Sequence, residues 1–344
     1  MSSASLFEQQ RLNRRRSAIL VAGFVLFFAW LGFGADYILY LQTAGGPPTA
    51  YHHTFPFVGI ALTLLAVGMT GFAWRSGAKQ VLSATGAWEL VTPSTPEEQQ
   101  LVNVVEEMSI ASGVPKPRIW IVPDDDPNAF ATGSDPKASH IAVTRGLLTT
   151  LNRDELQAVV AHEMAHVRNL DVRLMTLLAA LVGVIALLSD ITRRWLWFGG
   201  GRGGRRSGGG RKGGGGGNAL VLVLIVVWVI SVILAPIISR MLALAVSRKR
   251  EYLADATGAQ FTRNPAALAS ALEKIEGAVA PTKSIRHGSA HLCIADPLGR
   301  RASLKEGFVA NLLATHPPMA RRIARLKQMA YQYEKTGELI EPAL

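Results

Sequence analysis

Two apolar runs near the amino terminus constrain this chain more than any other feature. Residues 18–34 and 55–73 are each close to the ~20 residues that an α-helix needs to cross a bilayer. Four arginines within residues 11–16 precede the first run. That run is long for the apolar part of a signal peptide, and no A-x-A site follows it. We therefore expect a retained anchor, a hairpin of two transmembrane helices.

The distribution of positive charge predicts the orientation of this hairpin. Residues 35–54 contain no Lys or Arg, whereas Arg75 and Lys79 follow the second run. By the positive-inside rule, the amino terminus and the chain after residue 73 face the cytoplasm. We expect a bacterial-type inner (plasma) membrane protein.

Composition supports a multi-pass membrane protein with one modest soluble domain. Only 18% of the residues are charged, against about 25% in soluble proteins. The net charge of +11 is gathered beside apolar segments and in a Gly/Arg-rich loop, residues 199–217. This loop resembles RNA-binding tails, but it lacks interleaved aromatic side chains, so we expect a solvated linker and no specific nucleic acid. The single cysteine, Cys293, excludes an intrachain disulfide and is typical of a small buried hydrophobic residue.

Two further apolar segments, residues 174–188 and 219–238, flank the Gly/Arg-rich loop. If both cross the membrane, the cationic loop lies outside, against the positive-inside rule. If neither crosses, both segments lie partly submerged and the loop stays inside. In either case the chain after residue 238 is on the same side as residues 77–170.

Capping signals and alternation predict an α+β soluble domain. Thr95 to Glu98 form a capping box with Pro at the first helical position, and Gly113 ends that helix. Asn152 and Glu155 cap a later helix, which is expected to continue directly into the third apolar segment. Short strands are expected at residues 118–122, 128–132 and 140–144, and further helices near residues 265–277 and 319–329.

The chemistry is carried by an H-E-x-x-H motif on the helix capped by Asn152. His162 and His166 are one helical turn apart, so both imidazoles can bind one metal ion. Glu163 lies beside them, where it can hold and deprotonate a water molecule. Two surface histidines on a helix are the alternative, and the position between a soluble domain and an apolar segment weighs against it.

A catalytic zinc needs a third protein ligand. Glu251 is the best candidate, because it returns to the same side of the membrane, and Asp255 one turn later can orient a ligand histidine. The basic residues around these acids favour a solvated mixed-charge face when the pattern is taken alone. If Glu251 is not the ligand, Glu276, Asp296 and His316 are the remaining candidates.

Taken together, the motifs resemble those of the HtpX-type membrane zinc metalloproteases, gluzincins related to the CAAX prenyl proteases. The resemblance extends from the hairpin to about residue 326. It is carried by residues 128–131, the H-E-x-x-H, the Glu251/Asp255 pair, residues 291–292, 296–298 and 315–318, and Arg322 with Ile323. It implies one Zn²⁺ per chain, bound by His162, His166 and Glu251, with Glu163 as general base.

Physical chemistry, together with the resemblance for His316, suggests roles for the remaining motif residues. The strand containing Asn128, Ala129 and Phe130 can pair with an extended peptide, and Asn128 can help hold the substrate carbonyl. His316, in the family's H-P motif, can donate to the oxyanion, an interaction worth ~3 kcal/mol where single donors have been removed. Arg322 would hold this part of the active site in place.

We therefore predict a mostly helical α+β, multi-pass membrane protein with a gluzincin-like zinc metalloprotease domain that carries a small β-sheet. The predicted function is hydrolysis of peptide bonds in damaged or misfolded membrane proteins at the bilayer, with the catalytic domain facing the cytoplasm. The alternatives are a narrow-specificity prenyl-protein or signalling-peptide protease and a catalytically silent membrane scaffold. The expected divisions are a hairpin (1–76), a first catalytic part (77–173), the apolar pair with its loop (174–238), a second catalytic part (239–330) and a tail (331–344).

Overall fold

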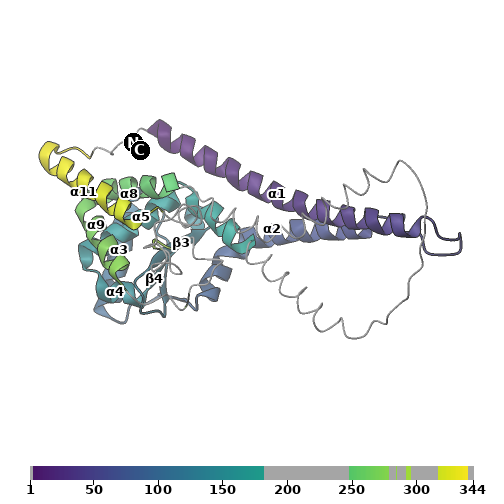
Figure 1. The fold of residues 1–344 in the computed structure, drawn as a ribbon. Coiled ribbons are helices and arrows are strands. Elements are labelled where there is room, and N and C mark those ends of the chain that lie inside the picture. Colours follow the sequence, from purple (N-terminus) through teal and green to yellow (C-terminus); the bar gives the residue numbers. More distant parts are fainter. Residues whose placement is uncertain (1–2, 182–247, 279–283, 285–291, 296–316, 340–344) are drawn as a thin grey trace. The chain divides into compact units, whose positions relative to one another are not determined.

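The computed structural model describes residues 3–181, 248–278, 284, 292–295 and 317–339. The chain forms two compact units (Figure 1). One comprises residues 1–18, 72–180 and 242–344, and the other comprises residues 19–71 and 181–241. The predicted Gly/Arg-rich loop, the fourth apolar segment and His316 lie outside the described residues.

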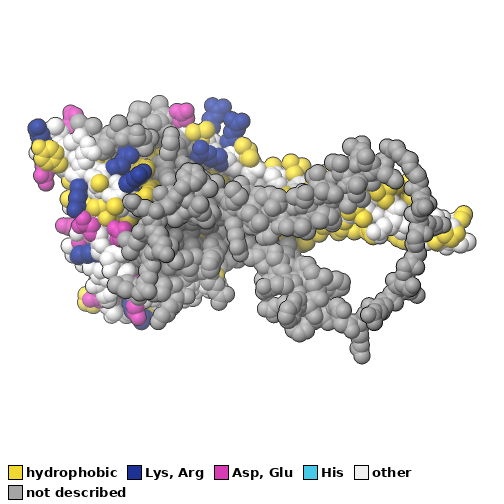
Figure 2. Space-filling model, in the orientation of Figure 1, with side chains coloured by type: hydrophobic (Ala, Val, Ile, Leu, Met, Phe, Trp, Pro, Cys, Tyr) yellow, Lys and Arg dark blue, Asp and Glu magenta, His cyan; other side chains and the backbone are white. Residues whose placement is uncertain are grey.

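The two long helices at the amino terminus contain the predicted apolar runs. Helix α1 spans Ser3–Thr43 and α2 spans Phe57–Ala84. Among the described residues, Gln10–Thr43 and Phe57–Ala84 are long and apolar enough to cross a membrane. Hydrophobic side chains are visible along these helices in Figure 2. The exposed ones include Leu26, Trp30, Phe33, Leu64, Val67 and Phe72.

Small residues and one buried acid hold α1 and α2 together within the unit that includes residues 19–71. A Cβ on Gly32 would lie 2.7 Å from Gly59 Cα, so the two backbones touch there. Asp36 lies on α1, and its carboxylate accepts hydrogen bonds from the backbone N–H groups of Val58 and Gly59 at the start of α2. His53 Nε2 lies 2.7 Å from Asp36 Oδ1. The carboxylate thus satisfies N–H groups that have no partner within α2.

Helix α3, Pro96–Ser112, begins and ends at the predicted residues. Thr95 Oγ1 accepts from Glu98 N, and Gly113 ends the helix in the left-handed conformation, φ 69°. The predicted capping box is nevertheless incomplete. The Glu98 carboxylate accepts from the backbone N–H and the hydroxyl of Ser94, so it does not return to Thr95.

The sheet has four strands in the order β1-β2-β4-β3. They span Trp88–Glu89, Arg118–Val122, Ala129–Gly133 (β3) and Ser139–Thr144 (β4). The pair β2–β4 is parallel, and β1–β2 and β3–β4 are antiparallel. The short helices η1, Pro136–Ala138, and α4, Arg145–Thr150, flank β4. Strand β3 is therefore an edge strand.

Alternating side chains divide the sheet between two packed layers. One face joins the main core with α3 and the later helices, and includes Ile119, Ile121, Ile141 and Val143. The other face packs on the end of α2 and on residues 171–181, and includes Val122, Phe130 and Ala142. Cys293 is buried in this second layer, as predicted. The prediction of a mostly helical domain with a small sheet is confirmed.

Helix α5, Arg153–Arg168, carries the H-E-x-x-H motif through the core. Asn152 and Glu155 form a complete capping box at its amino end. The helix packs against α3, β3 and two later helices, and most of its residues from Glu155 to Val167 are buried. The polar side chains of the motif therefore lie inside the core together with the apolar ones.

The prediction that this helix continues directly into the third apolar segment is wrong. Asn169 ends α5, and Leu170 takes a left-handed conformation with φ 60°. Residues 171–181 then form a separate helical segment. A non-glycine residue at positive φ is unfavourable, so tertiary contacts must hold this break in place.

The carboxyl-terminal part adds α8, Arg248–Thr262; α9, Pro265–Gly277; and α11, Met319–Thr336. Helix α9 begins and ends where the sequence predicts, whereas α11 continues seven residues beyond the predicted end at residue 329. Helices α8 and α9 both pack on α5, and α11 packs on both of them. This arrangement brings residues more than eighty positions apart to the H-E-x-x-H helix.

Candidate metal centre

Helices α5 and α8 bring three candidate ligands together. His162 and His166 of α5 and Glu251 of α8 offer ligand atoms that all lie within 4.8 Å of one another. Glu251 Oε2 lies 3.7 Å from His162 Nε2, and Glu251 Oε1 lies 3.6 Å from His166 Nε2. All three residues are buried. The structure thus places Glu251 beside the histidines, not on a solvated face.

Asp255 and Arg322 form a buried ion pair next to His162. Asp255 Oδ1 lies 2.9 Å from His162 Nδ1. Arg322 donates to both carboxylate oxygens of Asp255, at 2.9 and 2.7 Å, and to Ile294 O at 2.9 Å. Its Nη1 also lies 3.3 Å from Glu251 Oε2. Arg322 therefore holds the carboxylate that orients His162.

A second carboxylate, missed in the sequence, faces the other histidine. Asp171 Oδ2 lies 3.2 Å from His166 Nδ1, and Asp171 is fully buried. Arg250 Nε lies 3.8 Å from Asp171 Oδ1. An acid that follows the H-E-x-x-H helix within one turn is the only sequence signal for this role. The predicted continuous helix would have directed Asp171 elsewhere.

Glu163 is held by the edge strand. Its carboxylate accepts a hydrogen bond from the backbone N–H of Ala131 in β3. Its Oε2 is buried and has no hydrogen-bond partner among the described residues. Burial raises the pKa of the Glu163 carboxyl to about 7. A carboxylate with one unbonded oxygen and a pKa near neutrality suits a general base.

The two histidines have opposite pKa shifts. Burial lowers the pKa of His162 below its ordinary value. Burial opposes the charged form of His166 too, but the hydrogen bond to Asp171 and the charge of Glu251 raise its pKa to about 9. His166 is therefore the histidine that carries a proton at neutral pH in the absence of a metal ion.

Burial would raise the pKa of Asp255, but the charge of Arg322 and the adjacent imidazole of His162 lower it below the ordinary value. The nearby carboxylates raise the pKa of Arg322, against the effect of burial. Asp255 therefore stays ionised beside His162.

The edge of β3 is partly occupied by the chain itself. Ile294 N donates to Ala129 O, and Phe130 and Cys293 form an isolated antiparallel bridge. Asn128 is buried, and its side-chain amide donates to Ala295 O. A peptide strand bound along β3 would compete with residues 292–295 at Ala129.

Gly258 sets the distance between α5 and α8. A Cβ at Gly258 would lie 3.0 Å from His162 N and 3.1 Å from His162 Cα. Gly258 follows Glu251 by two helical turns, so it lies on the same face of α8. A side chain at this position would force the two helices apart by a few tenths of an ångström, because the nearest atoms belong to the backbone of α5. Sequence spacing from Glu251 is the one signal that could have identified it.

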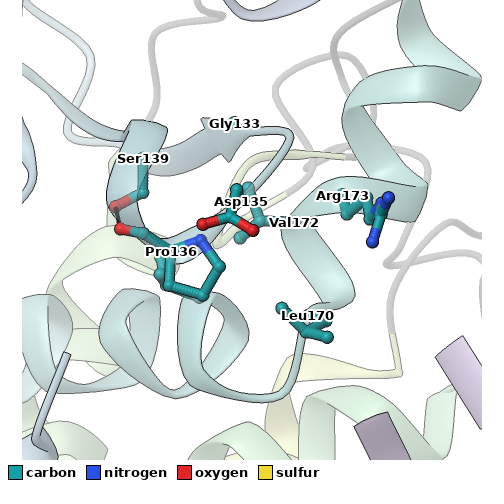
Figure 3. A pocket seen from close by; sticks show the side chains of 8 residues that line it. Gly133, Asp135, Pro136, Ser139, Leu170, Val172 and Arg173 are labelled. Atoms are coloured by element: carbon teal, nitrogen blue, oxygen red, sulfur yellow. Dashed lines mark hydrogen bonds between the residues drawn. The ribbon is translucent and has the colours of Figure 1, made fainter. Parts of the chain in front are cut away.

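A separate hollow lies between the β3–β4 turn and the residues that follow α5. Figure 3 shows Asp135 and Pro136 of the turn on one side of it and Leu170 and Arg173 on the other. None of the candidate ligands lines it. We assign it no role at the metal centre.

Comparison with known proteins places this arrangement in a family. Residues 95–330 match the family described as peptidase family M48, a match that includes the H-E-x-x-H motif, Glu251 and Arg322. The chain belongs to peptidase family M48. It is a membrane-associated metalloprotease, and its substrates are polypeptides.

Relatives match over nearly the whole chain. A protein described as a protease HtpX homolog from Thermoanaerobacter pseudethanolicus is 38% identical over 331 residues, which cover 96% of this chain and 99% of the relative. One of the same description from Streptococcus gordonii is 36% identical, covering 94% and 100%. A crystal structure of Ste24p from S. mikatae aligns with a TM-score of 0.45 at 16% identity, covering 94% of this chain and 67% of that one. The resemblance to HtpX-type proteases is confirmed.

Proposed function

We propose that this chain is a zinc-dependent endopeptidase of the bacterial inner (plasma) membrane, with its active site in the cytoplasm. Its substrates would be damaged or misfolded membrane proteins, presented as extended segments near the bilayer. The observation that carries this proposal is the meeting of Glu163 with His162, His166 and Glu251 in one buried cluster.

The donor set fits a catalytic zinc ion. Two imidazoles and one carboxylate are the ligands of one class of catalytic zinc sites. Ligands at about 2.0–2.1 Å from a tetrahedral ion lie a little over 3 Å apart, close to the 3.6 and 3.7 Å separations from Glu251 to the two histidines. Bound there by His162, His166 and Glu251, zinc would supply a Lewis acid and a water molecule of lowered pKa.

The chain's own residues then orient the histidine ligands and transfer the proton of the attacking water. Asp255 and Asp171 hold the imidazoles of His162 and His166 with one ring nitrogen directed at the cluster. Glu163, with its unbonded Oε2, accepts the proton of the attacking water and delivers it to the leaving amine. The substrate would lie along β3, in competition with residues 292–295 at Ala129, and its backbone hydrogen bonds would demand little of its sequence.

The role of Glu163 is tested by Glu163→Gln. We expect hydrolysis to fall by 10²–10⁴-fold, because the amide keeps the shape but cannot take the proton. Zinc content, measured on detergent-purified protein, is expected to stay at one ion per chain. Near-normal turnover in this variant would refute the mechanism.

The role of Glu251 is tested by Glu251→Ala, which we expect to lose both zinc and activity. Glu273→Gln is the control, because Glu273 is half exposed on α9 and, among the described residues, its ion pair is with Lys327 on the surface. Stoichiometric zinc and normal turnover in Glu251→Ala would show that another residue completes the site.

Orientation and substrate need separate measurements. In a Cys293→Ser background, a cysteine at Thr49 is expected to react with an impermeant maleimide in intact cells, and one at Ser134 is not. The reverse result would place the active site outside. Cleavage of unfolded casein but not of a prenylated tetrapeptide supports broad specificity, and the opposite preference would favour a prenyl-protein protease.

A further inference from the structure

The amino-terminal turns of α1 contain one buried polar residue among exposed cations. Arg11, Arg14 and Arg16 are exposed, as expected of charges that set membrane orientation. Asn13 lies between them and is fully buried. Positive-inside charge accounts for the arginines, but it does not account for a buried amide.

The side chains of α1 complete the carboxyl end of the H-E-x-x-H helix. The last four C=O groups of a helix have no partner within it. Gln10 Nε2 donates to Arg168 O at 2.8 Å, and Asn13 Nδ2 donates to Asn169 O at 2.9 Å. Helix α5 has no glycine at its end, so these amides from α1 satisfy its carbonyl groups.

Asn13 makes a second bond that leads to the metal centre. Its Nδ2 also donates to Asp171 Oδ1 at 2.6 Å. The other oxygen of this carboxylate, Oδ2, lies 3.2 Å from His166 Nδ1. Because Oδ1 accepts from Asn13 while Oδ2 faces His166, Asn13 fixes the plane of the Asp171 carboxylate toward His166. Arg250 is farther from Asp171, at 3.8 Å.

We propose that Asn13 is a positioning residue for the metal centre, which acts by holding Asp171 against the ligand histidine His166. The inference rests on the proposed zinc site. It makes the cytoplasmic end of the membrane anchor part of that site, since Asn13 and Asp171 are 158 positions apart in the chain. The asparagine is neutral, so it orients the carboxylate without cancelling its charge.

The test is the zinc affinity of the full-length, detergent-purified protein, measured by competition with a chromophoric chelator. Loss of an outer-shell partner typically costs 10–100-fold in metal affinity. We expect Asn13→Ala to weaken zinc binding by about tenfold, at the low end of this range, because Asn13 acts through Asp171. Asn13→Asp keeps the shape, loses the donor and adds a repelling charge, so it is expected to weaken binding at least as much.

Ser17→Ala is the matched control. Ser17 is buried one turn farther along α1, and within the described part of the chain its hydroxyl donates to Asn13 O of the same helix alone. We expect its zinc affinity to stay within about twofold of wild type. If Asn13→Ala fails to fold, as judged from the melting temperature of the zinc-free protein, Asn13→Leu, which keeps the volume and adds no charge, replaces it.

A double-mutant cycle separates positioning from simple anchoring of α1. In an Asp171→Ala background, Asn13→Ala is expected to change zinc affinity by less than about twofold, because its target is gone. An equal tenfold loss in that background, or an Asn13→Ala affinity within twofold of wild type, would overturn the inference. Wild-type protein that binds no zinc would instead overturn the proposed function, and this inference with it.

Discussion

Replacement of Arg322 by Met should leave a buried carboxylate without its cation. Arg322 is fully buried and donates to both oxygens of Asp255. Removing one partner of a buried ion pair costs about 3–5 kcal/mol, because the other charge stays desolvated. For a domain of 150–250 residues, about 1 kcal/mol shifts the melting temperature by 2–4 °C. We therefore expect the zinc-free protein to melt about 6–20 °C lower at pH 8.

The pH dependence identifies the cause of this loss. In the wild type the pKa of Asp255 lies below its ordinary value, so its stabilising contribution persists above about pH 4. Without Arg322, burial is unopposed and the pKa of Asp255 rises. The site then takes up a proton, on Asp255 or on His162, as the pH falls. The difference between wild type and variant should therefore shrink between pH 8 and pH 5.

The assay is thermal unfolding of the detergent-solubilised, zinc-free proteins at both pH values. Arg321→Met is the matched control, because Arg321 is the preceding residue on α11 and is exposed. It removes the same charge without a buried partner, and it should shift the melting temperature by less than about 2 °C. A loss in Arg322→Met that is the same at pH 8 and pH 5 would indicate lost packing and would refute the electrostatic argument.

Three further predictions follow from individual contacts. Gly258→Ala should weaken zinc binding and destabilise the protein by about 1–3 kcal/mol, because the added Cβ would push α8 away from His162. Gly277→Ala is the control: Gly277 has open space around it, so the same melting and zinc-binding assays should show no change. Zinc affinity should rise by about tenfold per pH unit between pH 7 and 8.5, because zinc must displace the proton of His166. Asp171→Ala should flatten this pH dependence, because Asp171 helps to raise the pKa of His166. Arg263→Gly should raise the melting temperature by about 1–4 °C, because exposed Arg263 follows α8 in the left-handed conformation, φ 54°, which glycine adopts without strain. An unchanged melting temperature would show that Arg263 is not strained.

Elements with local signals were predictable from the sequence. Thr95, Gly113 and Asn152 cap helices by short-range hydrogen bonds, and the structure places those helix ends where the residues predict. The break at Asn169 and Leu170 was not predictable, because a leucine at positive φ has no local signature. The two-residue strand β1 and the six-residue helix α4 were missed, since both are too short to show a periodicity.

The residues of the candidate site likewise fall into those with a local sequence signal and those without one. The spacing of His162 and His166 and the pairing of Glu251 with Asp255 are helical patterns, so the sequence could nominate them. Asp171 and Gly258 depend on how α5 ends and how closely α8 crosses it. Asn13 depends on α1 meeting the end of α5. The contacts of Gly258 and Asn13 join residues far apart in the chain, so no short window of sequence contains them.

The two ligand histidines are held by relays that differ in charge. His162 faces Asp255, which Arg322 holds by two hydrogen bonds, whereas His166 faces Asp171, which accepts from the neutral amide of Asn13 and lies 3.8 Å from Arg250 Nε. Both carboxylates favour a proton on the histidine that they face, and the charge of Arg322 opposes that proton at His162. Burial therefore prevails at His162 and lowers its pKa, whereas the hydrogen bond to Asp171 and the charge of Glu251 prevail at His166 and raise its pKa to about 9. In the proposed zinc site, His166 is therefore the histidine whose proton is exchanged for the metal ion.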